Sequence, residues 1–313
     1  MTALAIATLL RPVVVRGLLE RIDPHHALRL LTGSLALLAG AGTASLVLLT
    51  AAAAAQLPLV AAVGELSPAR LAQRQPSALP IGALAAVILL VVATRLVTTA
   101  VRLLRRYRRV LRHDLPAAEG DRLIVLPDPV PYAVASPTLG RRRPGRVIAS
   151  TAMLDALTPE QSRALIAHEE AHIDGHHHVH LGVAALAVAL NPLLSPLQSA
   201  LVYAVERSAD EAAARAVGDR AVAAHAVGRA ALAARDATPP RGSSASHAAG
   251  LLLAVTTGPV PKRVGALMTR PPSGAGAGAV LANVLLVIGC AAFAAAMYAG
   301  LDLHMLFEFA ELH

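Results

Sequence analysis

Aromatic residues, cysteine and charge are all scarce in this chain, and each scarcity excludes a class of protein. Aromatic residues make up 2% of the 313 residues, and none is tryptophan. Because little is available to stack on bases, we expect no direct binding of nucleic acid, despite a net charge of +8. The single cysteine, Cys290, excludes an intramolecular disulfide, so a zinc site would depend on histidine and carboxylate ligands.

Charged residues are only 15% of the chain and hydrophobic residues 55%, with a mean hydropathy of +0.57. An ordinary soluble domain carries about 25% charged residues, so this composition favours a membrane protein. Three charge-free runs are long enough to cross a bilayer, which takes about 20 apolar residues. They predict membrane spans near residues 30–55, 78–100 and 278–301. Residues 1–15 could form a further span, an interfacial anchor or a signal-like start without a cleavage site, and the sequence leaves all three open.

Arginine placement predicts the orientation of these spans. The stretch RLLRRYRRVLR, residues 102–112, carries six arginines directly after the second run, and residues 141–146 add four. The tail after residue 301 holds no lysine or arginine. Because basic residues concentrate on the cytoplasmic side, we expect the region between the second and third spans to be cytoplasmic and the C-terminus to lie outside. A nucleic-acid patch is the less favoured interpretation of the same arginines.

The cytoplasmic region begins with short strands and continues as helices. Prolines and glycines separate three predicted strands, over residues 122–127, 131–136 and 146–151. A helix follows, with Thr158 as a candidate N-cap, Pro159 at the first helical position and Gln161 completing a capping-box pattern. Gly175 marks its expected end, about five turns later. A further helical stretch is predicted over residues 207–234.

The first of these helices carries the pattern H-E-x-x-H, from His168 to His172. Residues four apart share a helix face, so both histidines can bind one metal ion. Zinc would lower the pKa of a bound water to about 7, and Glu169 could accept its proton and later protonate the leaving amine. The competing interpretation is a chance pair in a chain with 13 histidines. The helix cap and the position after a basic membrane exit favour the metal site.

A catalytic zinc site needs a third protein ligand, for which Glu206 and Asp210 are the candidates. They are also four apart, so one carboxylate could bind zinc while the other orients a ligand histidine. The competing interpretation is an ordinary acidic helix face. If the apolar run 181–205 crossed the membrane, Glu206 would emerge on the side opposite to the histidines. Pro192 and Pro196 interrupt that run, however, and predict a helical hairpin that returns to the same face.

The residues VIASTAMLDALTPEQSRALIAHEEAHIDGHHHVH, followed by NPLL and VERSADEAAARAVGD, resemble the membrane zinc peptidases of the BlaR/MecR sensor-transducer type. They resemble the HtpX type more distantly, and are most similar to short actinobacterial members that lack a sensor domain. The resemblance implies a mainly α-helical integral membrane protein, in which transmembrane helices flank a cytoplasmic α+β, gluzincin-like zinc peptidase domain. It also implies one Zn²⁺ per chain, bound by His168, His172 and Glu206, with Glu169 as general base and Asp210 orienting a ligand.

Five segments are expected on this basis. They are an N-terminal membrane region 1–112, a zinc peptidase domain 113–235, a linker 236–277, a last transmembrane helix 278–301 and a short external tail 302–313. The expected function is a zinc-dependent endopeptidase of the cell membrane, with its active site facing the cytoplasm. Its expected partners are membrane lipid and a protein or peptide substrate, a transcriptional repressor being one candidate. The substrate is expected to lie as an extended strand beside an edge strand such as 131–136.

Two alternative functions are open. A non-enzymatic signalling scaffold on the same fold would predict the loss of Glu169 or of a ligand, and neither is lost. A metal-handling membrane protein is suggested by HHHVH, residues 176–180. Such a cluster at a helix end is more often solvated and incidental, and the predicted spans contain no chain of acidic or histidine ligands that a transport path would use.

Overall fold

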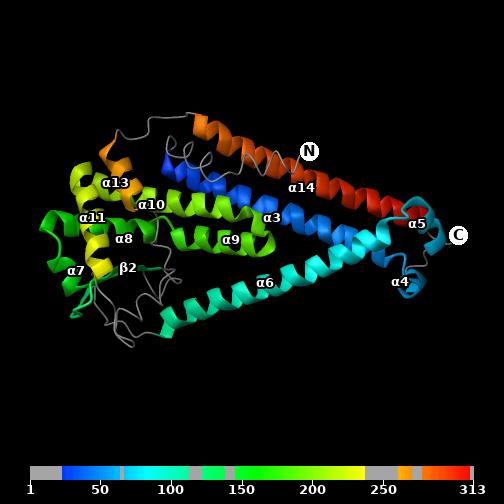
Figure 1. Ribbon diagram of the computed structural model, residues 1–313, viewed down its shortest axis with the longest axis horizontal. Helices are drawn as coiled ribbons and strands as arrows, with labels where there is room; N and C mark the ends of the chain where they lie inside the picture. The colour runs from blue at the N-terminus through cyan, green and yellow to red at the C-terminus, as the bar shows by residue number, and fades with distance from the viewer. Residues whose placement is uncertain are drawn as a thin grey trace. The chain divides into compact units, whose positions relative to one another are not determined.

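The computed structural model is mainly helical (Figure 1). It describes residues 23–63, 67–112, 122–137, 145–236, 260–269 and 277–310. The chain divides into two compact units, the first made of Met1–Arg29, Val101–Gly182 and Pro196–Leu281, the second of Leu30–Ala100, Val183–Ser195 and Ala282–His313. The possible extra span at residues 1–15 and the second arginine cluster up to residue 144 lie outside the described residues.

Long apolar helices make up most of the second unit. They are α3 (Pro24–Ala54), α6 (Ala78–Arg112) and α14 (Ala277–Ala310), with the short helices α4 (Pro58–Val63) and α5 (Pro68–Arg74) between the first two. The first turn of α3, the end of α6 from Val101 and the start of α14 belong to the first unit. Among the described residues, Pro24–Ala54 and Ala78–Arg108 are long and apolar enough to cross a membrane. They coincide with the first two predicted spans. In α14 the described side chains form a shorter apolar stretch, Leu286–Asp302.

The three predicted strands are confirmed and form one small sheet in the first unit. They are β1 (Leu123–Leu126), β2 (Ala133–Ser136) and β3 (Arg146–Ser150), in the order β1-β3-β2. The central strand β3 pairs with β1 in parallel and with β2 in antiparallel orientation, with Ala135 opposite Val147. Ile124, Tyr132 and Ile148 pack together on the sheet. Strand β2 is therefore an edge strand, with one side of its backbone unpaired within the sheet.

Helix α8 (Pro159–Asp174) follows the sheet after the short helix α7 (Thr151–Asp155). The predicted capping box is confirmed, because the Thr158 side chain accepts from the Gln161 N–H and the Gln161 side chain accepts from the Thr158 N–H. The helix ends at Gly175 as predicted. These caps satisfy backbone groups that a free helix end would leave without partners, and so they set the register of α8.

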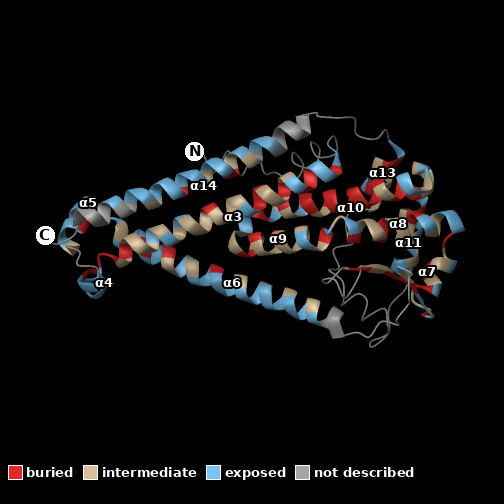
Figure 2. Cartoon of the chain, turned by 180° about the vertical axis from the view of Figure 1, so that it is seen from behind, coloured by how far each residue is buried: buried red, intermediate tan, exposed pale blue. Residues whose placement is uncertain are grey.

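The predicted hairpin is also confirmed. Helix α9 (His177–Leu190) ends at Asn191, a 3₁₀ turn η1 (Pro192–Leu194) follows, and α10 (Ser195–Val217) returns. The Asn191 side chain accepts from the Leu193 N–H and begins the turn. Ser208 of α10 lies 3.5 Å from His177 at the start of α9. Helix α10 is buried along most of its length, as its colouring in Figure 2 shows.

The helical stretch predicted over 207–234 is confirmed except for a break at Gly218, where φ is 72°. Asp219 then begins α11 (Arg220–Asp236) by accepting from the Ala221 N–H. A further helix, α13 (Val260–Met268), was not predicted and lies inside the expected linker. Helix α11 packs against both α8 and α13 (Figure 1). The Arg220 side chain donates to the main-chain oxygens of Ala266 and Leu267 and pairs with Glu211 of α10, which ties α13 to the core.

Candidate metal and catalytic site

The two histidines of the H-E-x-x-H pattern lie on one face of α8, as their spacing predicts. His168 is buried and His172 partly buried. Their Nε2 atoms are 3.2 Å apart, and the rings meet edge to face. The two Nε2 atoms therefore face each other and could bind the same metal ion.

Glu206 joins them from α10. Its Oε2 lies 3.8 Å from His168 Nε2, and its Oε1 lies 3.8 Å from His172 Nε2. The side chain is almost completely buried, at 2% exposure. The hairpin between α9 and α10 makes this meeting possible, because it returns the chain to α8.

These three side chains fit a zinc ion. One ligand atom from each lies within 4.8 Å of the others, and two imidazoles with one carboxylate are a donor set that zinc uses in catalytic sites. Ligand atoms 2.0–2.1 Å from a tetrahedral ion are separated by about 3.3–3.4 Å, close to the distances between these three side chains. The buried Glu206 Oε2 forms an ion pair with Arg263, whose Nη1 lies 2.8 Å away.

Glu169 lies next to the cluster and is 8% exposed. Burial, together with the nearby Glu206 carboxylate, raises the pKa of this carboxyl to about 7 against the opposing charge of His168. The backbone N–H of Ala135, on edge strand β2, donates a hydrogen bond to it. A carboxyl group with such a pKa can both accept and release a proton near neutral pH.

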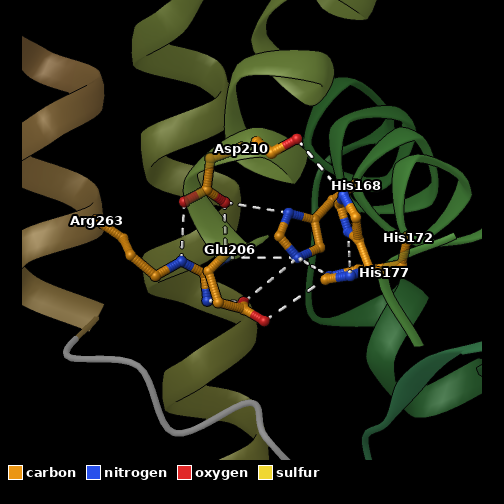
Figure 3. A network of polar contacts seen from close by, with 7 residues as sticks. His168, His172, His177, Glu206, Asp210 and Arg263 are labelled. Carbon is orange, nitrogen blue, oxygen red and sulfur yellow. Dashed lines mark hydrogen bonds and ion pairs between the residues drawn. The ribbon is translucent and has the colours of Figure 1, made fainter. Parts of the chain in front are cut away.

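Asp210 lies behind His168, with a carboxylate oxygen 3.1 Å from Nδ1 of that ring. Arg263 holds the same carboxylate through two contacts, from Nε at 2.8 Å and from Nη2 at 2.6 Å. Figure 3 shows the Arg263 side chain extending from α13 to both Asp210 and Glu206. All three side chains are buried, so the two carboxylates depend on this guanidinium for charge balance.

These contacts shift the pKa values of the buried groups in opposite directions. Burial alone would raise the pKa of Asp210, but the hydrogen bonds and charge of Arg263, with those of His168, hold it well below its usual range. Burial opposes protonation of His168, and the Asp210 carboxylate outweighs it and raises the pKa. His172 has no such carboxylate at its Nδ1, and burial with the nearby His168 and His177 holds its pKa well below the ordinary value. The contact with Asp210 favours a proton on Nδ1 of His168 and therefore a lone pair on Nε2, the atom that faces His172 Nε2 and lies 3.5 Å from Nη2 of Arg263.

A cavity of about 400 Å³ opens onto these residues, and its lining contains His168, Glu169, His172 and Glu206. The remaining lining is mainly apolar. It comes from β2 with the preceding Pro131 and Tyr132, from Leu103 and Tyr107 of α6, and from one face of α11 that carries Ala223, Ala226, Val227 and Ala230. The lining also contains the basic side chains Arg106 of α6 and Arg263 of α13, so the cavity combines apolar walls with both acidic and basic groups.

The structure brings all five predicted site residues together: His168, Glu169, His172, Glu206 and Asp210. Two contributors were not predicted. Arg263 lies in the stretch GPVPKRVGALMTR, whose prolines and glycines indicate a linker, so only its charge was a signal. His177 belongs to the histidine run that was interpreted as solvated, yet it is 1% exposed and contacts His172.

Part of the chain is similar to a known protein family. A family model, Peptidase family M48, matches residues 99–188. Neither the curated proteins nor the solved structures contain a match to the chain. The matched residues include His168, Glu169 and His172 and end before Glu206. Residues 99–188 are thus similar to Peptidase family M48, and this similarity supports a metallopeptidase.

Proposed function

We propose that the chain is a zinc-dependent endopeptidase of the cell membrane whose active site faces the cytoplasm. The observation that carries this proposal is the meeting of His168, His172 and Glu206, with Glu169 beside them in one cavity. The match to Peptidase family M48 supports the same reaction class. Because the sequence resembles the BlaR/MecR type, and more distantly the HtpX type, we propose a relationship to these membrane peptidases.

Each side chain has a distinct part in this proposal. His168, His172 and Glu206 hold the ion, and Asp210, itself held by Arg263, orients His168. Bound zinc supplies Lewis acidity, which polarises a peptide carbonyl and lowers the pKa of water to about 7. Glu169 accepts a proton from the attacking water and delivers it to the leaving amine.

Edge strand β2 is the proposed docking site for the substrate backbone. Ala135 directs its N–H to Glu169 and away from β3, and Ala133 faces the same side because alternate residues of a strand do so. A peptide added beside β2 would bring its own backbone next to Glu169. The apolar lining from α11 then favours substrates with an apolar side chain near the scissile bond. A cytoplasmic or membrane protein fits this description, and a transcriptional repressor is one candidate.

Zinc removal tests the reaction. The full-length chain, purified in detergent, should contain about one zinc per molecule and cleave an unfolded protein such as casein. A chelator should abolish cleavage, and added zinc should restore it. Cleavage that persists in zinc-free protein would contradict the proposal.

The same experiment separates the alternative functions. Zinc without cleavage of any unfolded protein would favour the signalling scaffold. Within the described residues, three or more possible metal ligands come together at His168, His172 and Glu206 alone, which gives the metal-handling alternative no second site.

Membrane insertion is supported by the surface of α6. Over the predicted span its large apolar side chains are exposed, among them Leu84, Val87, Leu90 and Val91. Soluble monomers rarely expose apolar patches of this extent, and lipid would cover this one. Six arginines directly after the span favour a cytoplasmic site.

Cysteine labelling tests this orientation. In a Cys290→Ser background, a membrane-impermeant maleimide should label Asp302→Cys in intact cells but Glu160→Cys only after lysis. Both positions are exposed, so accessibility within the protein does not limit the reaction. Labelling of Glu160→Cys in intact cells would reverse the proposed orientation.

A further inference from the structure

His177 contacts the predicted zinc ligand His172. The two Nδ1 atoms are 2.9 Å apart, and the rings meet edge to face with centroids separated by 4.8 Å (Figure 3). His177 is 1% exposed and begins α9 immediately after the turn that ends α8. It therefore occupies, at His172, the place that Asp210 occupies at His168.

The backbone before His177 is shaped to allow this contact. Gly175 has an ordinary φ of −78°, but a Cβ on it would lie 2.5 Å from Nε2 of His177 and 2.9 Å from the main-chain oxygen of Ala171. Any other residue at this position would have to displace the ring, the end of α8, or both. His176 adopts a φ of 49°, a conformation that residues with a side chain seldom take. Both features are explained if the position of the His177 ring matters.

The contact continues beyond His177 to a third helix. Its Nε2 lies 3.5 Å from the hydroxyl oxygen of Ser208, a residue of α10 with no exposed surface. The same hydroxyl lies 3.2 Å from Nδ1 of His25, in the first turn of α3. A continuous row of polar contacts thus links His172 to the beginning of the first long helix.

The proposed role of His172 as a metal ligand determines the direction of these hydrogen bonds. Nε2 of His172 faces His168 and Glu206, and a metal ligand must present a lone pair there, so the proton of His172 is on Nδ1. That N–H donates to Nδ1 of His177, which leaves the His177 proton on Nε2, directed at Ser208. The Ser208 hydroxyl in turn donates to His25.

We propose that His177 is a positioning residue, which accepts a hydrogen bond from Nδ1 of His172 and so fixes that ring in the orientation and tautomer that bind zinc. The inference rests on the proposed function, because it assigns His172 as a ligand. The histidine run 176–180 thereby acquires a role at one position, His177, and needs no second metal site.

The experiment compares zinc affinity among four variants of the full-length chain, by competition with a chelator. His177→Phe keeps a planar ring but cannot accept the hydrogen bond, and should bind zinc about 10–100-fold more weakly. His177→Asn can accept through its side-chain oxygen and should keep most of the affinity. Gly175→Ala should weaken zinc binding at least as much as His177→Phe does, because its methyl group would clash with the His177 ring and with the main-chain oxygen of Ala171. His225→Phe, the same substitution at an exposed histidine of α11, should bind as wild type does.

The melting temperature of the zinc-free variants is the second measurement, and it separates positioning from packing. We expect His177→Phe to melt close to wild type without zinc and to gain less stability when zinc is added. An unchanged zinc affinity in His177→Phe would overturn this inference but not the proposed function. Equal losses in His177→Phe and His177→Asn would overturn the hydrogen-bonding role. Wild-type protein that binds no zinc would overturn both this inference and the proposed function.

Discussion

Glu169→Gln is expected to lower kcat by about 10²–10⁴-fold, the usual contribution of a positioned general base. The amide nearly matches the carboxyl in shape and can still meet the Ala135 N–H, but it cannot accept a proton from water. Zinc should remain bound, since Glu169 is not one of the three proposed ligands, His168, His172 and Glu206. The measurement is the rate of casein cleavage, with the zinc content determined on the same sample.

Glu170→Gln is the matched control, because it makes the same change one residue along α8. Glu170 is half-buried and is absent from both the ligand cluster and the cavity lining. Its rate should stay within about threefold of wild type, as for most substitutions that touch no site. If Glu169→Gln retained wild-type activity, another residue would be the base, and the H-E-x-x-H pattern would have to be explained as a binding site only.

The predicted site residues come from two local patterns, which is why the sequence revealed them. A capped helix places His168 and His172 on one face, and a second four-residue spacing does the same for Glu206 and Asp210. Pro192 completed the inference, because a proline within an apolar run predicts a break rather than a span. Helix periodicity and proline chemistry are short-range properties, so they can be read without knowledge of the fold.

Arg263 and His177 could not be found in this way. Arg263 is 53 residues from Asp210 in the chain and reaches it only because α13 packs beside α11. His177 contacts His172 through a turn whose shape depends on His176 adopting a positive φ. Both contacts are products of tertiary packing. Asp210 is buried beside His168 and needs charge balance, and only the tertiary structure shows that Arg263 supplies it.

Glu206→Ala is expected to lower zinc affinity by at least about 100-fold, because it leaves two protein ligands where a catalytic zinc site uses three. Glu206→Gln should bind zinc with intermediate strength, since its amide oxygen is a weaker donor. Asp210→Asn should lose about 10–100-fold, as expected for a residue that orients a ligand. The measurement is the zinc dissociation constant by chelator competition.

Glu211→Gln is the control for Glu206, because it alters another buried carboxylate on the same helix. Glu211 pairs with Arg207 and Arg220 and contacts neither ligand histidine, so its loss should lower the melting temperature and leave zinc affinity unchanged. Zinc affinity that falls equally in Glu211→Gln and Glu206→Ala would mean that α10 only supports the site. Affinity retained in Glu206→Ala would exclude Glu206 as a ligand, and Asp210, the other carboxylate on that face of α10, would become the candidate.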